Sequence, residues 1–184
     1  MLKQRDLAEC GALFELIRHP EVFPYVRQKA YTPEEFLFLT KQVIEQETQQ
    51  QLISRTILDE WSQPIGTITL YDIEDQTGYL GTWIGKPYFG KGYNQKAKTA
   101  FFTEVFTQTD IHTIFMRIRK ENIRSQKAAL KSPYVQPFED IESLHYQKHI
   151  DQFNLYMVTK ERFLLHQQTI ESFVQTNEQE LREA

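Results

Sequence analysis

A glycine-bearing loop is the part of the sequence best suited to chemistry. It runs from Gly85 to Asn94 as Gly-Lys-Pro-Tyr-Phe-Gly-Lys-Gly-Tyr-Asn, between a predicted strand and a predicted helix. Glycines let backbone N–H groups turn towards one point, and the start of the helix adds partial positive charge. The loop therefore predicts an anion site, most often for phosphate, although a plain strand–helix turn has the same glycines.

Two nucleotide-binding motifs share features with this loop and do not fit it. Gly85, Gly90 and Lys91 have the spacing of a P-loop, but that motif needs Ser or Thr next to hold Mg²⁺, and Gly92 stands there. The dinucleotide fingerprint would need a glycine where Gln95 stands. A phosphate bound by this loop would therefore belong to a ligand of another class.

Further motifs follow the loop in a fixed order. Asn122-Ile123-Arg124-Ser125 comes about thirty residues later, then Pro133-Tyr134, then the segment 151–158. Together with the loop they resemble the GNAT superfamily of N-acetyltransferases, especially the branch that acetylates ribosomal-protein N-termini on alanine or serine. Phe89–Tyr93 is similar to that branch's aromatic-Gly-x-Gly-x loop, and the resemblance covers roughly residues 1–163.

The resemblance implies acetyl-CoA as co-substrate. Loop amides would bind its pyrophosphate, the strand end before the loop would pair with its pantetheine arm, and lysines would suit its 3′-phosphate. The cofactor-binding residues implied are Trp83, Ile84, Phe89, Gly90, Lys91, Gly92, Tyr93, Asn94, Asn122, Ser125 and Lys127. Lys91, Ser125 and Lys127 also fit solvated side chains.

The residues for proton transfer are less clear. Asn122 and Tyr134 are the catalytic candidates: Asn122 would contact pantetheine or orient a water, or simply cap a helix, and Tyr134 would be the general acid, or pack in the core. Ala129 stands where many relatives place the tyrosine that protonates the departing thiolate. Four carboxylates could accept a proton through water, or could be solvated turn residues: Asp72, Glu74, Asp75 and Glu121.

The resemblance implies that a primary amine attacks the acetyl thioester directly within a ternary complex. The acceptor would be a protein N-terminal α-amine or a small amine. The alternative is a GNAT-like module that binds acyl-CoA with little catalysis, which the alanine at 129 and the unclear base motivate.

The elements that must position these residues follow from periodicity. Helices are predicted over 8–18, 33–47, 95–106 and 123–131 and from residue 164 onward, and strands over 52–58, 65–71, 78–84, 111–118 and 154–158. Thr32-Pro33-Glu34-Glu35 forms a capping box before the second helix. This order predicts an α/β (α+β) fold whose central sheet is mixed, mostly antiparallel and flanked by helices on both faces.

Length and charge limit the remaining possibilities. The 184 residues suggest a GNAT domain over 1–163 with a helical extension over 164–184, whose apolar stripe would pack on the domain or form a homodimer. Net charge is −4, which disfavours direct nucleic-acid binding. No stretch reaches the about 20 apolar residues of a membrane span, and a cytoplasmic location is expected. No metal site is predicted, because His145 and His149 lack further ligands.

Overall fold

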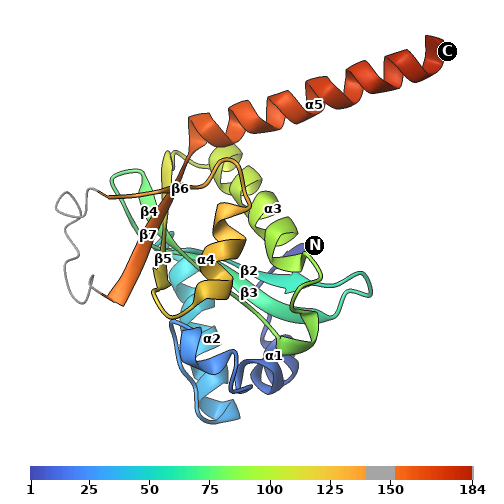
Figure 1. Ribbon diagram of the computed structural model, residues 1–184. Helices are drawn as coiled ribbons and strands as arrows, with labels where there is room; N and C mark the ends of the chain where they lie inside the picture. The colour runs from blue at the N-terminus through green and yellow to red at the C-terminus, as the bar shows by residue number, and fades with distance from the viewer. Residues whose placement is uncertain (140–151, 184) are drawn as a thin grey trace.

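The computed structural model describes residues 1–139 and 152–183, with side chains as far as Gln175. Its seven-stranded sheet has the order β1-β2-β3-β4-β5-β7-β6, and every neighbouring pair is antiparallel except β4 and β5 (Figure 1). In chain order the elements are β1 (Leu2–Gln4), η1 (Leu7–Glu9), α1 (Cys10–Ile17), η2 (Phe23–Tyr25), α2 (Pro33–Thr48), β2 (Ile53–Leu58), β3 (Pro64–Glu74), β4 (Thr77–Ile84), η3 (Lys86–Tyr88), α3 (Tyr93–Gln108), β5 (Thr113–Arg119), α4 (Ile123–Leu130), β6 (Gln136–Pro137), β7 (Phe153–Thr159) and α5 (Lys160–Glu183).

The mixed, mostly antiparallel sheet predicted from the sequence is confirmed. Two edge strands were not predicted, β1 and β6, because three and two residues are too few to show an alternating pattern. The capping box before α2 differs in one bond. The Thr32 side chain accepts from the Glu35 N–H as expected, but the Glu35 carboxylate accepts from the N–H of Tyr31, one residue earlier than the motif requires.

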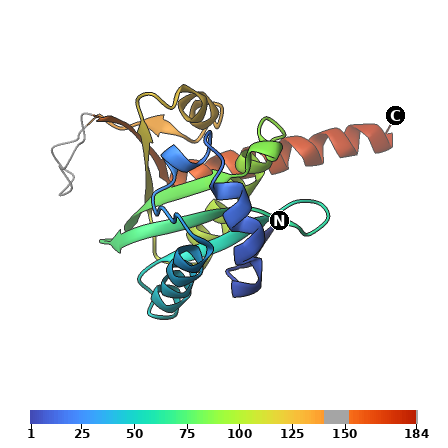
Figure 2. The same cartoon turned by 90° about the horizontal axis from the view of Figure 1, so that it is seen from below.

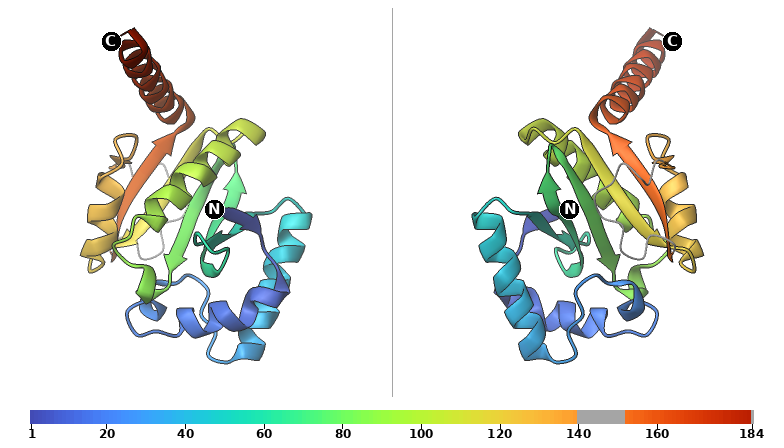
Figure 3. Two further views of the ribbon diagram at one scale, coloured as in Figure 1. Left: turned by 90° about the vertical axis from the view of Figure 1, so that its right-hand side faces the viewer. Right: turned by 90° about the vertical axis from the view of Figure 1, so that its left-hand side faces the viewer.

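The helices cover both faces of the sheet (Figures 2 and 3). α1 and α2 pack on one face around a small core that includes Leu13, Phe14 and Phe36. α3, with α4 beside it, packs on the other face around the larger core, whose centre is formed by fully buried Phe101 and Phe102. The functional residues lie where these two layers meet the middle of the sheet.

The two parallel strands separate along their length. β4 and β5 are paired only over Thr77–Tyr79 and Thr113–Phe115. Beyond these residues β5 continues to pair with β7, and β4 with β3, but not with each other. The backbone edge of β4 from Leu80 to Ile84 therefore faces a gap in the sheet.

α5 begins inside the domain and ends outside it. The helix is continuous across the boundary predicted between residues 163 and 164, and Phe163 in its first turn is fully buried. Beyond that turn it projects away from the sheet (Figure 1). Up to Gln175, its large exposed apolar residues are Leu165, Ile170, Phe173 and Val174.

Neither a membrane-spanning helix nor a cluster of metal ligands occurs among the described residues. No helix among them has the length and apolar character that crossing a bilayer requires. Residues 1–139 and 152–183 hold no group of three or more His, Cys, Asp or Glu side chains that could bind a metal ion. The pair His145 and His149 lies outside the described residues.

Candidate active site

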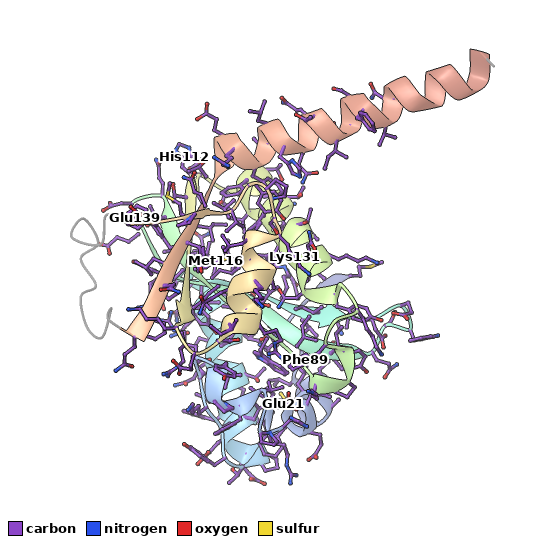
Figure 4. All side chains as sticks on the ribbon, in the orientation of Figure 1. Glu21, Phe89, His112, Met116, Lys131 and Glu139 are labelled. Carbon is purple, nitrogen blue, oxygen red and sulfur yellow. The ribbon has the colours of Figure 1, made fainter. Side chains whose placement is uncertain are left out.

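A cavity of about 960 Å³ opens where β4 and β5 separate. It passes from the α3–α4 side of the sheet to the α1–α2 side. Figure 4 labels three of its lining residues, which come from the loop before α3, from β5 and from the end of α4: Phe89, Met116 and Lys131. We call the part beside α3 and α4 the cofactor half, and the part beside α1 and α2 the acceptor half.

The glycine loop forms one end of the cofactor half. Gly90 and Gly92 have φ angles of 74° and 82°, in the left-handed region that glycine adopts at little cost. Gly92 is the N-cap of α3 and has no side chain to accept from the first-turn N–H groups. The N–H groups at the start of a helix lack intrahelical acceptors, so this uncapped end is suited to an anion.

Two side-chain contacts hold the loop in place. The Arg124 guanidinium of α4 lies over the Phe89 ring, 3.6 Å from its centroid. The Tyr93 hydroxyl donates to the Glu60 carboxylate of the β2–β3 turn, and this hydrogen bond raises the pKa of Tyr93 to about 12. The loop is thus fixed to the domain from both sides of its turn.

A buried lysine lies in the cofactor half. Lys98 of α3 is only 7% exposed and lines the cavity. No described residue forms a hydrogen bond or ion pair with its ammonium, and burial lowers its pKa from 10.5 to about 8. Three further cations line this half from α4 and its C-cap: Arg124, Lys127 and Lys131. An unpartnered buried ammonium is costly unless an anion joins it, so this half is built for negative charge.

A buried hydroxyl beside the gap between β4 and β5 also lacks a hydrogen-bond partner among the described residues. Thr82 lies on the separated part of β4, and its Oγ1 is buried with no hydrogen-bond partner among the described residues. With the unpaired backbone edge of β4, this hydroxyl needs a polar ligand in the gap.

The structure brings most of the predicted cofactor-binding residues to the cavity. Those that line it are Trp83, Ile84, Phe89, Gly90, Gly92, Tyr93, Asn94, Asn122, Ser125 and Lys127. Asn122 is also the N-cap of α4, with Oδ1 accepting from the Ser125 N–H at 3.2 Å, so both of its predicted roles are compatible with its place. Lys91 differs, because it is exposed, does not line the cavity and lies over the Tyr88 ring at 5.7 Å.

Tyr134 lies in the core. Its side chain is 3% exposed and does not line the cavity. Its ring contacts the rings of Phe102 and Phe163, and its hydroxyl is 3.0 Å from Oγ1 of Thr99. This position agrees with the core-packing alternative, and the role of general acid stays a prediction.

None of the four carboxylates considered as proton acceptors lines the cavity. Asp72 accepts two hydrogen bonds from Arg27, at 2.8 and 2.9 Å, and Glu121 is exposed, 3.8 Å from Arg119. Indeed no Asp or Glu occurs among the described lining residues.

Three residues of the site were missed in the sequence. Lys98 had a usable signal: it lies on the same helical face as Phe101, Phe102 and Val105, where a lysine is unexpected. Thr82 and Arg5 had none, because their burial depends on elements far along the chain.

Comparison with known proteins shows which solved structures share this fold. Nothing matches among curated protein sequences. Three solved structures share the fold at 13–17% identity. One is the ribosomal-protein-S5-alanine acetyltransferase of Vibrio fischeri (TM-score 0.67, 17% identity, 86% of this chain and 92% of that one).

The other two structures hold ligands. The spermidine N-acetyltransferase of Vibrio cholerae in complex with CoA and spermine has a TM-score of 0.72 at 13% identity, over 89% of this chain and 97% of that one. The microcin C7 self-immunity acetyltransferase MccE, with acetyl-CoA and AMP, has a TM-score of 0.70 at 16% identity, over 86% and 91%. The sequence family described as the acetyltransferase (GNAT) domain matches residues 1–133, which include the splayed strands, the glycine loop and α4. The chain therefore belongs to the GNAT family of acetyltransferases.

Proposed function

We propose that this protein transfers an acetyl group from acetyl-CoA to a primary amine by direct attack in a ternary complex. One observation carries the proposal: a single cavity connects the uncapped start of α3, the buried Lys98 and the gap between β4 and β5. Among the described residues, the start of α3 lacks an anion, the Lys98 ammonium lacks a negatively charged partner, and the edge of β4 lacks a hydrogen-bonding strand. A phosphorylated chain with amide groups, such as the phosphopantetheine part of acetyl-CoA, supplies all three.

The residues of the cofactor half would hold acetyl-CoA by separate means. First-turn N–H groups of α3, from Tyr93 to Gln95, would donate to the pyrophosphate. Lys98 and the cations of α4 would neutralise phosphate charge. The edge of β4 would pair with the pantetheine amides as a further strand would, with Thr82 able to share a hydrogen bond.

The acceptor half would prepare the amine. Bound acetyl-CoA supplies the thioester whose carbonyl carbon the amine attacks. Among the residues that the structure describes, no carboxylate lines the cavity to stabilise an ammonium, and several arginines do line it. Nearby positive charge and burial both lower an amine's pKa, so the neutral, nucleophilic form is favoured and its proton passes to water. A backbone N–H of β4 near Ile84 would donate to the carbonyl oxygen as charge develops.

The printed names of the structural neighbours include acceptors as different as spermidine and a ribosomal protein. They support an amine acceptor without choosing its class. A protein N-terminal α-amine or a small amine both suit the proposal. The second candidate function is an acyl-CoA-binding module with little catalysis. It draws on the alanine at 129 and on the core position of Tyr134, because neither residue supplies an acid to the cavity.

Isothermal titration with acetyl-CoA, followed by a thiol-release assay over amines and peptides, tests both functions. Saturable binding with turnover on at least one acceptor is expected. Binding without turnover on any acceptor would favour the module, and absence of binding would contradict both.

Replacing Glu121 should leave catalysis unchanged. Its carboxylate is exposed and does not line the cavity. We expect Glu121→Gln to keep the kcat/KM of the wild-type protein and the shape of its pH profile, because water accepts the proton. The measurement is kcat/KM against pH for both proteins with the same amine. Loss of the acidic limb in the variant would identify Glu121 as the base.

Acetyl-CoA binding should take up protons near pH 8. In the free protein burial lowers the pKa of Lys98 to about 8, and bound phosphate would raise it again. The complex then holds more protons than the free protein, so affinity falls as the pH rises above about 8. Titrations in two buffers of different ionisation enthalpy measure this uptake, and acetyl-CoA has no free thiol to interfere. Equal heats in both buffers at pH 8–9 would show that Lys98 does not meet the phosphates.

A further inference from the structure

The acceptor half of the cavity is strongly cationic. Five basic side chains line it. Arg5 follows β1, Arg27 and Lys29 come from the segment before α2, and Arg117 and Arg119 come from β5. Among the described residues, no carboxylate lines either half. The acceptor half lies across the sheet gap from the cations assigned to phosphate, so acetyl-CoA does not account for its charge.

Two carboxylates behind the lining lie close to three of these side chains. Asp72 accepts from Arg27 and lies 3.7 Å from Arg117, so one carboxylate serves two guanidinium groups. Arg119 is 3.8 Å from the exposed Glu121. Among the described residues, the acceptor half therefore has more basic than acidic side chains in and behind its lining.

Arg5 has a buried donor that no described residue satisfies. It follows β1, and its Nη2 donates to Oγ1 of Thr40 on α2 at 3.3 Å. Its Nε is buried, and no described residue accepts its hydrogen bond. Burial lowers the pKa of the guanidinium, although an arginine stays charged. A buried charged donor without an acceptor is rare in proteins unless a ligand completes it.

Hydroxyls line the cavity beside Arg5, and the carboxylates of Glu9 and Glu47 act on its charge from outside the lining. Buried Thr40 and Thr67 line the cavity with it, as does half-buried Tyr71, whose ring lies under Arg27 at 4.3 Å. Hydroxyls can donate to an anion or accept from a cation, and arginine can only donate. The set as a whole is complementary to a carboxylate or phosphate group, which a guanidinium binds through a planar pair of donors.

We propose that the amine acceptor carries an anionic oxygen group, carboxylate or phosphate, that binds Arg5 in the acceptor half. The inference rests on the proposed function and narrows its acceptor class. The site does not suit polyamines, because their additional ammonium groups would meet arginine and lysine, with no carboxylate in the described lining. The anion would also orient the amine towards the sheet gap.

NMR of the arginine Nε–Hε groups tests the inference without any turnover. The protein is saturated with CoA, so that the cofactor half is occupied, and titrated with inorganic phosphate, sodium acetate or spermidine at constant ionic strength. We expect one resonance, assigned as Arg5 by its loss in Arg5→Gln, to shift and saturate with phosphate or acetate. The Arg18 resonance, on the exposed side of α1, should not move. No saturable shift at Arg5, or the same shift with spermidine, would overturn the proposal.

Matched acceptors give a second readout. O-Phosphoethanolamine is compared with ethanolamine for the phosphate arm, and β-alanine with propylamine for the carboxylate arm. We expect at least one anionic member to exceed its neutral partner in kcat/KM by about tenfold or more, as a charged hydrogen bond would give. Arg5→Gln should remove this preference, and Arg18→Gln, with the same loss of charge outside the cavity, should keep it. A neutral amine or spermidine preferred over both anionic acceptors would overturn the proposal.

The two failures are distinguishable. If the proposed function is wrong, acetyl-CoA does not bind or no acceptor turns over, and thiol release shows this directly. If only the acceptor class is wrong, acetyl-CoA binds and amines react. The Arg5 resonance then does not shift with phosphate or acetate, and the anionic acceptors are not preferred to their neutral partners.

Discussion

Lys98→Met should make the free protein more stable and make acetyl-CoA bind less tightly. The ammonium is 7% exposed and unpartnered among the described residues, so a linear apolar side chain of similar length removes a desolvation cost. We expect the free energy of unfolding to rise by roughly 1–3 kcal/mol. Acetyl-CoA affinity should fall about tenfold or more, because a charge-assisted contact to phosphate is lost.

The stability gain should depend on pH in a defined direction. The pKa of Lys98 is about 8 in the folded protein and 10.5 for an ordinary lysine. Between these values the unfolded chain holds a proton that the folded protein has lost, so wild-type stability rises with pH across this window. The advantage of Lys98→Met is therefore full below about pH 8 and shrinks towards pH 10.5.

Lys96→Met is the matched control for this variant. Lys96 lies on the same helix two residues earlier, is exposed and does not line the cavity. Lys96→Met should change the melting temperature and the dissociation constant for acetyl-CoA much less than Lys98→Met does. Thermal unfolding and isothermal titration measure the two quantities. A Lys98→Met protein that binds acetyl-CoA as tightly as the wild type would place Lys98 outside the phosphate site.

The parts of the site that the sequence predicted are local. The loop from Gly85 to Asn94 needs only a strand, two left-handed glycines and a helix start, all within ten residues. Asn122 caps the helix that begins at the next residue, and the amide–serine spacing is sufficient to show it. In local motifs of this kind, the spacing of the residues along the chain is enough to predict their geometry.

The parts that sequence reasoning missed depend on packing between distant segments. Arg5 is buried because α2 places Thr40 beside it, 35 residues later. Tyr134 follows a short helix at the motif's usual distance, yet it turns into the core, where rings from α3 and α5 surround it. Spacing predicts which residue comes after the helix, but not which side of the helix becomes the interior.

The same packing makes Phe163→Ala the most destabilising change that we predict. Phe163 is fully buried, with its ring centroid 5.8 Å from Phe102, 5.6 Å from Phe106 and 5.0 Å from Tyr134. Removing it leaves a cavity lined by aromatic rings, at a cost of about 3–5 kcal/mol in the free energy of unfolding. Chemical denaturation, read by circular dichroism, measures this loss.

Phe173→Ala supplies the control on the same helix and tests the predicted boundary near residue 163. Its side chain is 69% exposed, so the same substitution should cost less than about 0.5 kcal/mol. This contrast would support a domain that ends within the first turn of α5, with an extension that adds little stability. A cost at Phe173 that rises with protein concentration would instead show that the stripe of Leu165, Ile170, Phe173 and Val174 is covered by a second copy of the chain, because stability that depends on association follows mass action.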